Sequence, residues 1–251
     1  MAKTTEPLDP QKELARSLGL VGLVEHWEDL AVAARTQIVT WEADTRRQRS
    51  LQRRLGAAKL GQFKAMADFD WMWPQEIDRE QVAELLTLDF VRVACNAILV
   101  GPNGTGKTMI CKNLVHLAVM AGYSARFIKT SDMLHDLAAQ PDARTRRNRI
   151  RHYCEPDLLA VDELGYLSYD NRYADLLFEV LDGRYQRKAT AISTNRHFSN
   201  WAEVFPSATS VVTLVDRVSH HAEVVNIKGG SWRLKEAKER DAMKAAARAK
   251  K

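Results

Sequence analysis

One eight-residue run, GPNGTGKT at Gly101–Thr108, constrains the fold of this 251-residue chain more than any other feature. It matches the pattern G-x-x-x-x-G-K-S/T at every specified position, and it stands between the apolar run Ala97–Val100 and a helical pattern over Thr108–Ala121. A glycine-rich turn between a strand and a helix points its backbone N–H groups at phosphate oxygens, and the helix dipole favours their negative charge. The sequence therefore predicts a phosphate-binding loop on a sheet covered by helices.

Each position of this loop has a predicted role in binding ATP. Gly101, Gly104 and Gly106 allow the backbone to curl around the phosphates. Lys107 is expected to reach the β- and γ-phosphates, and Thr108 to offer its hydroxyl to Mg²⁺. The intervening positions complete the predicted nucleotide-binding set: Pro102, Asn103 and Thr105.

Polar residues follow two further apolar runs. The run LLAVDE ends in Asp162 and Glu163, and the run ATAISTN ends in Asn195. Carboxyl ends of parallel strands are where ligands bind, so we expect Asp162 to join Thr108 as a Mg²⁺ ligand. Glu163 suits the base that polarises an attacking water, and Asn195 suits the amide that orients it. This acidic pair favours a hydrolytic ATPase over a kinase, which must exclude water.

Arg217 lies in a predicted helix just before the last strand. Such an arginine can reach across a subunit boundary and stabilise the charge on a neighbour's γ-phosphate, as a finger in trans. An ion pair with Asp216 or another acid of the same chain is the alternative.

The region from residue 96 predicts an α/β core. Short apolar runs alternate with amphipathic helices, which is typical of a parallel sheet covered on both faces. The expected strands are Ala97–Val100, Ala125–Ile128, Leu158–Val161, Ala189–Ser193 and Val224–Ile227.

The remaining chain divides into three predicted segments. Residues 1–67 are expected to form a helical N-terminal domain, beginning at Asp9-Pro10 and including helices over Leu23–Ala34 and about Gln37–Leu55. Residues 68–95 are expected to be a connector that Phe69, Trp71 and Trp73 anchor, with a short helix capped by Asp78. The core then spans 96–234, and a basic tail spans 235–251.

The charge distribution suggests a polyanionic partner. Net charge is +5, and no acid occurs from Thr45 to Ala67. Two further basic runs are Arg144–Arg151 and Lys235–Lys251. We predict contacts with double-stranded DNA, the alternatives being a solvated helix face or a surface that packs on a protein partner. The arginines predicted to contact DNA are Arg46, Arg47, Arg49, Arg53 and Arg54.

Other classes are disfavoured by composition. The sequence has no apolar run of membrane-spanning length and no signal-peptide pattern at its N-terminus, so we expect a cytoplasmic protein. Isolated cysteines, without any CxxC pair, predict neither a zinc site nor a disulfide framework: Cys95, Cys111 and Cys154.

Together with the loop, the segments DELGYL, LLFEVLDGRYQRKATAISTN, DRVSHHA and GGSWR resemble the IstB-like ATP-binding proteins, over about residues 35–235. These are transposition helper ATPases of insertion sequences, related to DnaC-type helicase loaders. The resemblance implies an AAA+ fold with strand order 5-1-4-3-2, homo-oligomerisation on target DNA, and recruitment or activation of a transposase. It assigns Arg217 to the arginine finger and makes Arg233 a candidate sensor-2 residue.

Two points qualify this expectation. Little chain follows Ile227, so we expect the full helical lid of AAA+ proteins to be absent. A replicative helicase loader shares the same core and is the main alternative function. A small-molecule kinase and a non-hydrolysing, ATP-gated DNA clamp are further alternatives.

Overall fold

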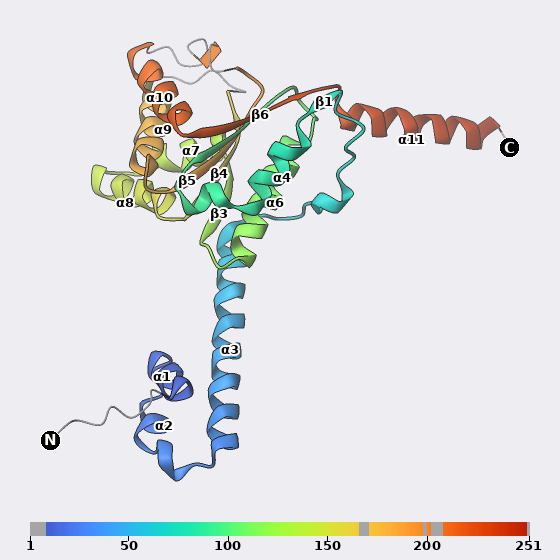
Figure 1. Ribbon diagram of the computed structural model, residues 1–251. Coiled ribbons are helices and arrows are strands. Elements are labelled where there is room, and N and C mark those ends of the chain that lie inside the picture. Colours follow the sequence, from blue (N-terminus) through green and yellow to red (C-terminus); the bar gives the residue numbers. More distant parts are fainter. Residues whose placement is uncertain (1–8, 166–170, 198–199, 202–207, 250–251) are drawn as a thin grey trace. The chain divides into compact units, whose positions relative to one another are not determined.

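The computed structural model describes residues 9–165, 171–197, 200–201 and 208–249 (Figure 1). The chain divides into two compact units, Met1–Arg53 and Arg54–Lys251. Within the described residues, no helix is both long and apolar enough to cross a membrane.

A buried tryptophan organises the first unit. Helix α1 (Pro10–Ser17) begins where predicted, because the Asp9 carboxylate accepts hydrogen bonds from the first backbone N–H groups. The same carboxylate accepts a hydrogen bond of 2.9 Å from the indole N–H of Trp27. Trp27 is buried with Ala15 and Val39 in a small apolar core.

The burial of Trp27 also breaks a predicted helix. We expected one helix over Leu23–Ala34, but the chain forms α2 (Val21–Glu25), the 3₁₀ turn η1 (Trp27–Asp29) and then α3 (Val32–Ala58). The prediction was wrong because a tight turn and an extended Leu30 are needed to bring the indole inward. Helix α3 is longer than predicted and continues past Gly56.

A mixed six-stranded sheet forms the centre of the second unit. Five of its strands are parallel: β2 (Asn96–Val100), β3 (Ala125–Lys129), β4 (Leu158–Leu164), β5 (Ala189–Thr194) and β6 (Ala222–Lys228). The sheet order β1-β6-β2-β5-β4-β3 places these five in the predicted order 5-1-4-3-2. The prediction of a five-stranded, all-parallel sheet was wrong by one strand, because β1 (Glu76–Ile77) adds antiparallel to β6.

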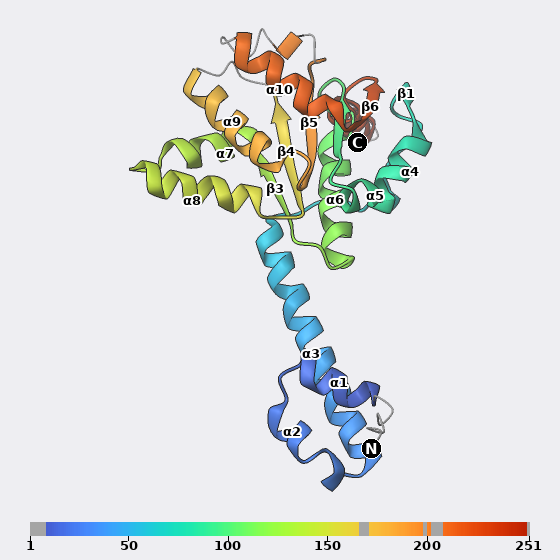
Figure 2. The same cartoon turned by 60° about the vertical axis from the view of Figure 1, so that its left-hand side comes forward.

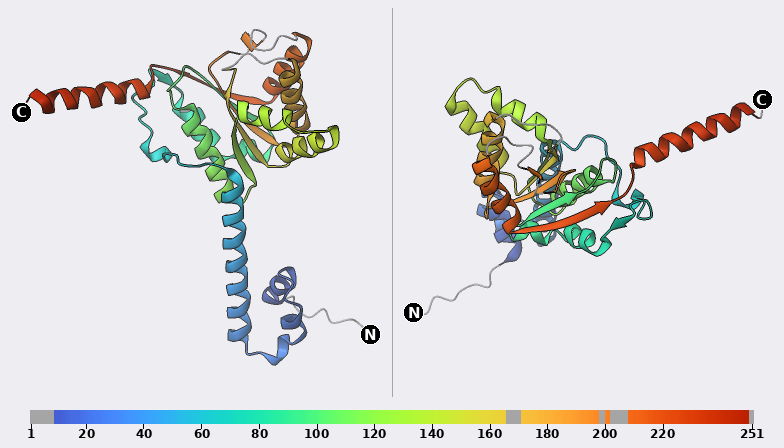
Figure 3. Two further views of the ribbon diagram at one scale, coloured as in Figure 1. Left: turned by 180° about the vertical axis from the view of Figure 1, so that it is seen from behind. Right: turned by 90° about the horizontal axis from the view of Figure 1, so that it is seen from above.

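Helices cover both faces of this sheet (Figures 1 and 3). One face carries α4 (Arg79–Thr87), α5 (Asp89–Arg92) and α6 (Lys107–Met120). The other carries α7 (Thr130–Ala138), α8 (Ala143–Cys154), α9 (Asn171–Arg184) and α10 (Ala208–His220), which share one apolar core with the sheet. Asp78 caps α4, as predicted. The remaining elements are the 3₁₀ turn η2 (Met66–Asp68) and α11 (Trp232–Ala249), which follows β6.

A buried arginine joins three of these elements. Arg184, at the end of α9, is 1% exposed, and no carboxylate of the described residues forms an ion pair with it. Burial lowers the pKa of Arg184 to about 10, so its guanidinium remains charged at neutral pH. It donates to groups at the end of α8 and the start of β5: the carbonyls of Tyr153, Cys154, Pro156 and Ala189, and the hydroxyl of Thr190. Carbonyls at a helix end lack intrahelical partners, so this side chain replaces water there.

Replacing Arg184 with methionine should lower the free energy of unfolding by at least about 3 kcal/mol, because buried carbonyls would lose their donors. Methionine keeps an unbranched chain that can fill much of the space. Urea denaturation of the full chain measures the change. The exposed Arg187→Met variant is the control and should stay within about 0.5 kcal/mol of the parent protein. Equal stability of the two variants would refute the bridging role.

Candidate active site

The predicted phosphate-binding loop lies between β2 and α6. Gly104 and Gly106 have φ angles of 80° and 97°, in the region that favours glycine. The N–H of Gly101 donates to the carbonyl of Thr194 at 3.1 Å, which fastens the loop to the end of β5. Helix α6 then begins at Lys107, so its N-terminus faces the loop as predicted.

Three distant segments press against the glycines of this loop. An added Cβ at any of the three would overlap a neighbour: the Ile227 carbonyl for Gly101, the Ser231 side chain for Gly104, and the Phe69 ring for Gly106. The connector and the segment after β6 therefore form walls of the loop. These contacts explain the need for glycine at the two glycine positions of the pattern, Gly101 and Gly106, and also at Gly104, which the pattern leaves unspecified.

Lys107 is buried within the loop. Its ammonium group donates to the carbonyls of Gly101 at 2.6 Å and Pro102 at 2.7 Å. Burial lowers the pKa of Lys107 to about 8, because the charged form loses water. The Thr105 hydroxyl also donates to Pro102, at 2.9 Å, so the loop holds its lysine in a hydrogen-bonded frame.

Asp162 lies at the base of the site. It is fully buried, and its carboxylate accepts hydrogen bonds from Thr108 Oγ1 at 2.9 and 3.1 Å and from Ser193 Oγ. Burial raises the pKa of Asp162, and the two hydroxyl hydrogen bonds oppose that rise. Thr108 and Asp162 thus bring hard oxygen ligands together, a donor set that fits Mg²⁺. Sequence reasoning missed Ser193, although a serine at the end of an apolar strand was a usable signal.

Glu163 stands at an irregularity between β4 and β5. The pairing shifts register between Val161 and Leu164, and Glu163 adopts φ 63°, which is unusual for a non-glycine residue. Its N–H donates to Ser193 Oγ at 3.0 Å, while its partly exposed carboxylate pairs with Lys129 at 3.0 Å. The bulge lets the two adjacent acids lie in different surroundings, one buried and one facing solvent. Nothing in the sequence around Lys129 predicted this ion pair.

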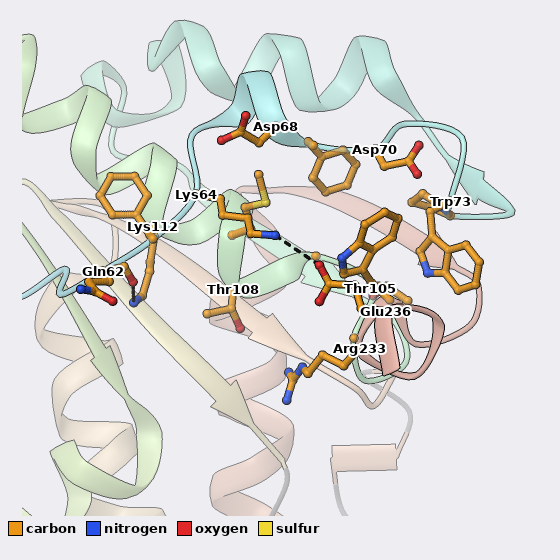
Figure 4. Close-up of a pocket in the computed structure, with 17 residues that line it drawn as sticks. Gln62, Lys64, Asp68, Asp70, Trp73, Thr105, Thr108, Lys112, Arg233 and Glu236 are labelled. Carbon is orange, nitrogen blue, oxygen red and sulfur yellow. Dashed lines mark hydrogen bonds and ion pairs between the residues drawn. The ribbon is translucent and has the colours of Figure 1, made fainter. Parts of the chain in front are cut away.

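A cavity of about 340 Å³ opens beside the loop (Figure 4). Its walls include Gly104–Gly106 and Arg233, together with an ion pair of 3.4 Å between Lys64 and Glu236. Four aromatic rings also line it: Phe63, Phe69, Trp73 and Trp232. An aromatic cavity next to a phosphate-binding loop can hold a planar base. Arg233 therefore lies at the edge of the predicted nucleotide site.

The first turn of α11 is fastened to this cavity. Trp232 N–H donates to the Gly104 carbonyl, and Trp73 Nε1 donates to the Gly230 carbonyl, both at 2.9 Å. The ammonium group of Lys235 lies 4.7 and 4.3 Å from the ring centroids of Trp73 and Trp232. The predicted anchoring is confirmed for Phe69, which contacts the loop, and for Trp73, which contacts the start of α11. The contacts described for Trp71 are with Phe69 and Arg79 of the connector itself.

The two remaining catalytic candidates have different surroundings. Asn195 is exposed just beyond β5. Arg217 pairs with Asp182 of α9, and its guanidinium lies over the rings of Phe178 and Tyr185 at 5.4 and 5.9 Å. Arg217 therefore forms the ion pair within its own chain that was the alternative to a finger in trans, and its acidic partner is Asp182. None of the contacts described for Arg217 is with a loop residue.

The arginines predicted to contact DNA are not equivalent. Arg46 pairs with Glu42 at 2.5 Å and Arg47 with Asp44 at 2.9 Å, whereas Arg49 and Arg53 are exposed. Arg54, the last arginine of the set, lines a cavity of about 250 Å³ together with Arg126 and His152.

The pKa of Lys107 predicts how ATP affinity depends on pH. Bound phosphate favours the charged amine, so affinity should be constant below about pH 8. Above that value binding must take up a proton, and affinity should fall by up to about tenfold per pH unit. Calorimetric titration across this range measures it. Lys107→Arg is the control, because its guanidinium stays charged and its affinity should not vary. A flat profile for the parent protein would contradict the assignment.

Residues 15–240 match the family model described as IstB-like ATP binding protein. The ATP-binding protein of insertion sequence IS232 from Bacillus thuringiensis subsp. berliner is 33% identical, covering 92% of this chain and 93% of that protein.

Solved structures share the fold. DnaI superimposes with a TM-score of 0.54 at 16% identity, covering 66% of this chain and 89% of that chain. The DnaC helicase loader gives a TM-score of 0.50 at 18% identity, covering 68% and 97%. These likenesses show that this chain shares the α/β fold of DnaI and the DnaC helicase loader. By the extent of the family match and the identity to its members, this chain belongs to the IstB-like ATP-binding proteins.

Proposed function

We propose that this protein is a Mg²⁺-dependent AAA+ ATPase that assembles as a homo-oligomer on double-stranded DNA and recruits or activates a transposase. The observation that carries the ATPase proposal is the contact of Asp162 with Thr108 beside the phosphate-binding loop, with Glu163 next in the chain. The occurrence of relatives in insertion sequences supports transposition as the process served.

The loop and its surroundings would bind the nucleotide. Backbone N–H groups of the loop and the Lys107 amine would hold the phosphates, while the aromatic cavity would take the base and ribose. Arg233 lies where a sensor residue could contact phosphate. Thr108 and Asp162 would hold Mg²⁺, which when bound supplies positive charge to the phosphate oxygens.

Hydrolysis requires a base and an oriented water. We assign the base to Glu163, whose carboxylate is partly exposed at the carboxyl edge of the sheet. Asn195, one strand away and exposed, would orient the same water. Lys129 holds the Glu163 carboxylate in place through its ion pair.

DNA contact is assigned in part to α3. Arg49 and Arg53 are exposed and lie four residues apart, hence on one face of the helix. Arg46 and Arg47, both exposed, would contribute by exchanging their carboxylate partners for phosphates, with little loss of stability because ion pairs at the surface contribute little.

Glu163→Gln should bind ATP with near-parental affinity and hydrolyse it at least about a hundredfold more slowly, because the water loses its base. Lys129→Gln removes the other half of the ion pair and keeps the base, so it should slow hydrolysis far less than Glu163→Gln does. Phosphate release and ATP binding are measured on both variants. Parental turnover by Glu163→Gln would exclude the proposed base and favour a non-hydrolysing clamp.

Arg217→Ala should bind ATP but not hydrolyse it, and mixing it with Lys107→Ala should restore some activity. Each variant would supply the half-site that the other lacks. Asp182→Asn breaks the intrachain ion pair and keeps the arginine, so hydrolysis should persist. If Asp182→Asn loses as much activity as Arg217→Ala, and mixing restores none, the arginine acts only within its own chain.

A further inference from the structure

Helix α8 has two different faces. Asp142 caps its N-terminus in a capping box, and none of the residues from Ala143 to Cys154 is acidic. On the inner face, Arg149 pairs with Asp136 of α7 and lies 5.5 Å from the ring centroid of Tyr153, which is buried. These contacts fix the helix against the core. Figure 2 shows α7 and α8 as a hairpin at the β3 side of the sheet.

The outer face consists of arginines without acidic partners. Arg144, Arg147 and Arg151 are exposed, and spacings of three and four residues place them on one side of the helix. No acid among the described residues forms an ion pair with any of these three, which we call the α8 arginine face. On α3, by contrast, Arg46 and Arg47 have carboxylate partners.

The spacing of the face suits a phosphate backbone. Seven residues of helix extend about 10.5 Å, close to the axial length of about three nucleotides in one strand of duplex DNA. Near the C-terminal end of the face, burial lowers the pKa of His152, Arg126 and Arg149 lower it further, and Asp136 and Glu155 oppose the shift. Charges of both signs therefore surround that end of the helix.

The chemistry of the face favours nucleic acid over an acidic protein. Arginine is weakly hydrated and binds phosphate through two parallel hydrogen bonds. Protein interfaces usually have an apolar centre, yet no large hydrophobic side chain described on α8 is exposed. Asn148, also exposed, adds a further polar group.

We propose that the α8 arginine face binds the sugar-phosphate backbone of DNA, so that the ATPase core contacts DNA directly. This inference rests on the DNA-binding part of the proposed function and adds arginines of α8 to those of α3. The three arginines project from one helix, whose inner face Arg149 and Tyr153 fix against Asp136 of α7.

The test is the salt dependence of DNA affinity in the full-length protein. Arg144, Arg147 and Arg151 are changed together to Gln, which keeps helix propensity. The control changes three exposed arginines elsewhere, Arg16, Arg92 and Arg187, and so removes the same net charge. Binding of a labelled random duplex, and of a single strand of the same length, is measured between about 50 and 200 mM salt.

The α8 variant should flatten the log–log salt slope on duplex DNA by up to about 2.7 units, at about 0.9 for each lost phosphate contact. Raising the salt from about 50 to about 200 mM lowers DNA affinity by some factor, and that factor should be up to about fortyfold smaller for the α8 variant than for the parent protein. The control should keep the parental slope, and ATP affinity should be unchanged in both variants. Flattening on the single strand, by up to about 2 units, would identify the same phosphate chemistry on that substrate.

Three results would overturn the inference. One is an unchanged slope for the α8 variant while the parent protein binds DNA, which would leave the proposed function standing. Another is equal flattening in the control, which would reduce the effect to net charge. The third is that the α8 variant loses affinity for polyglutamate, which serves as a model acidic polypeptide, while its DNA binding stays intact. That result would indicate an acidic protein as the partner. A parent protein that binds neither DNA would instead refute the DNA part of the proposed function.

Discussion

The site depends on one buried charge. Asp162 carries a carboxylate into the interior, where an ionised group needs hydrogen-bond donors, and two hydroxyls supply them. Thr108 comes from the first turn of α6 and Ser193 from β5, so this single group joins the phosphate-binding loop to two neighbouring strands. Ser193 also accepts from the N–H of Glu163, which fixes the backbone at the bulge. The positions of the loop and the acidic pair are therefore not independent.

The enclosure of the loop extends this dependence to remote parts of the chain. Phe69 approaches Gly106 from the connector, and Ser231 approaches Gly104 from the segment after β6. Lys235 and two tryptophans then hold the first turn of α11 against the connector. A change in the shape of the loop would displace both segments, because they are in van der Waals contact with it. The shape of the loop and the position of the first turn of α11 are thus linked through direct contacts.

The features that local sequence patterns determine were predicted correctly. The loop and the five parallel strands follow from a motif and from alternating apolar runs, whereas the strand order was implied by the resemblance to the IstB-like ATP-binding proteins. Sequence reasoning failed where tertiary contacts decide: β1 has only two residues, and the turn at Trp27 serves a distant carboxylate. The partners of the predicted site residues were also invisible, since Lys129 and Asp182 reach Glu163 and Arg217 from other elements. A motif specifies which groups are present, whereas packing specifies what each one faces.

The short strand β1 has a consequence for how this protein can associate. It covers part of β6, and the ion pair of 2.7 Å between Glu76 and Lys228 places charges on that margin of the sheet. At the opposite margin, β3 carries Arg126 and Lys129. Charged or covered margins oppose the addition of a further strand from another molecule. Such strand addition is a route to irreversible aggregation. Any contact between copies would then use side-chain surfaces, which can associate and separate without any rearrangement of the sheet.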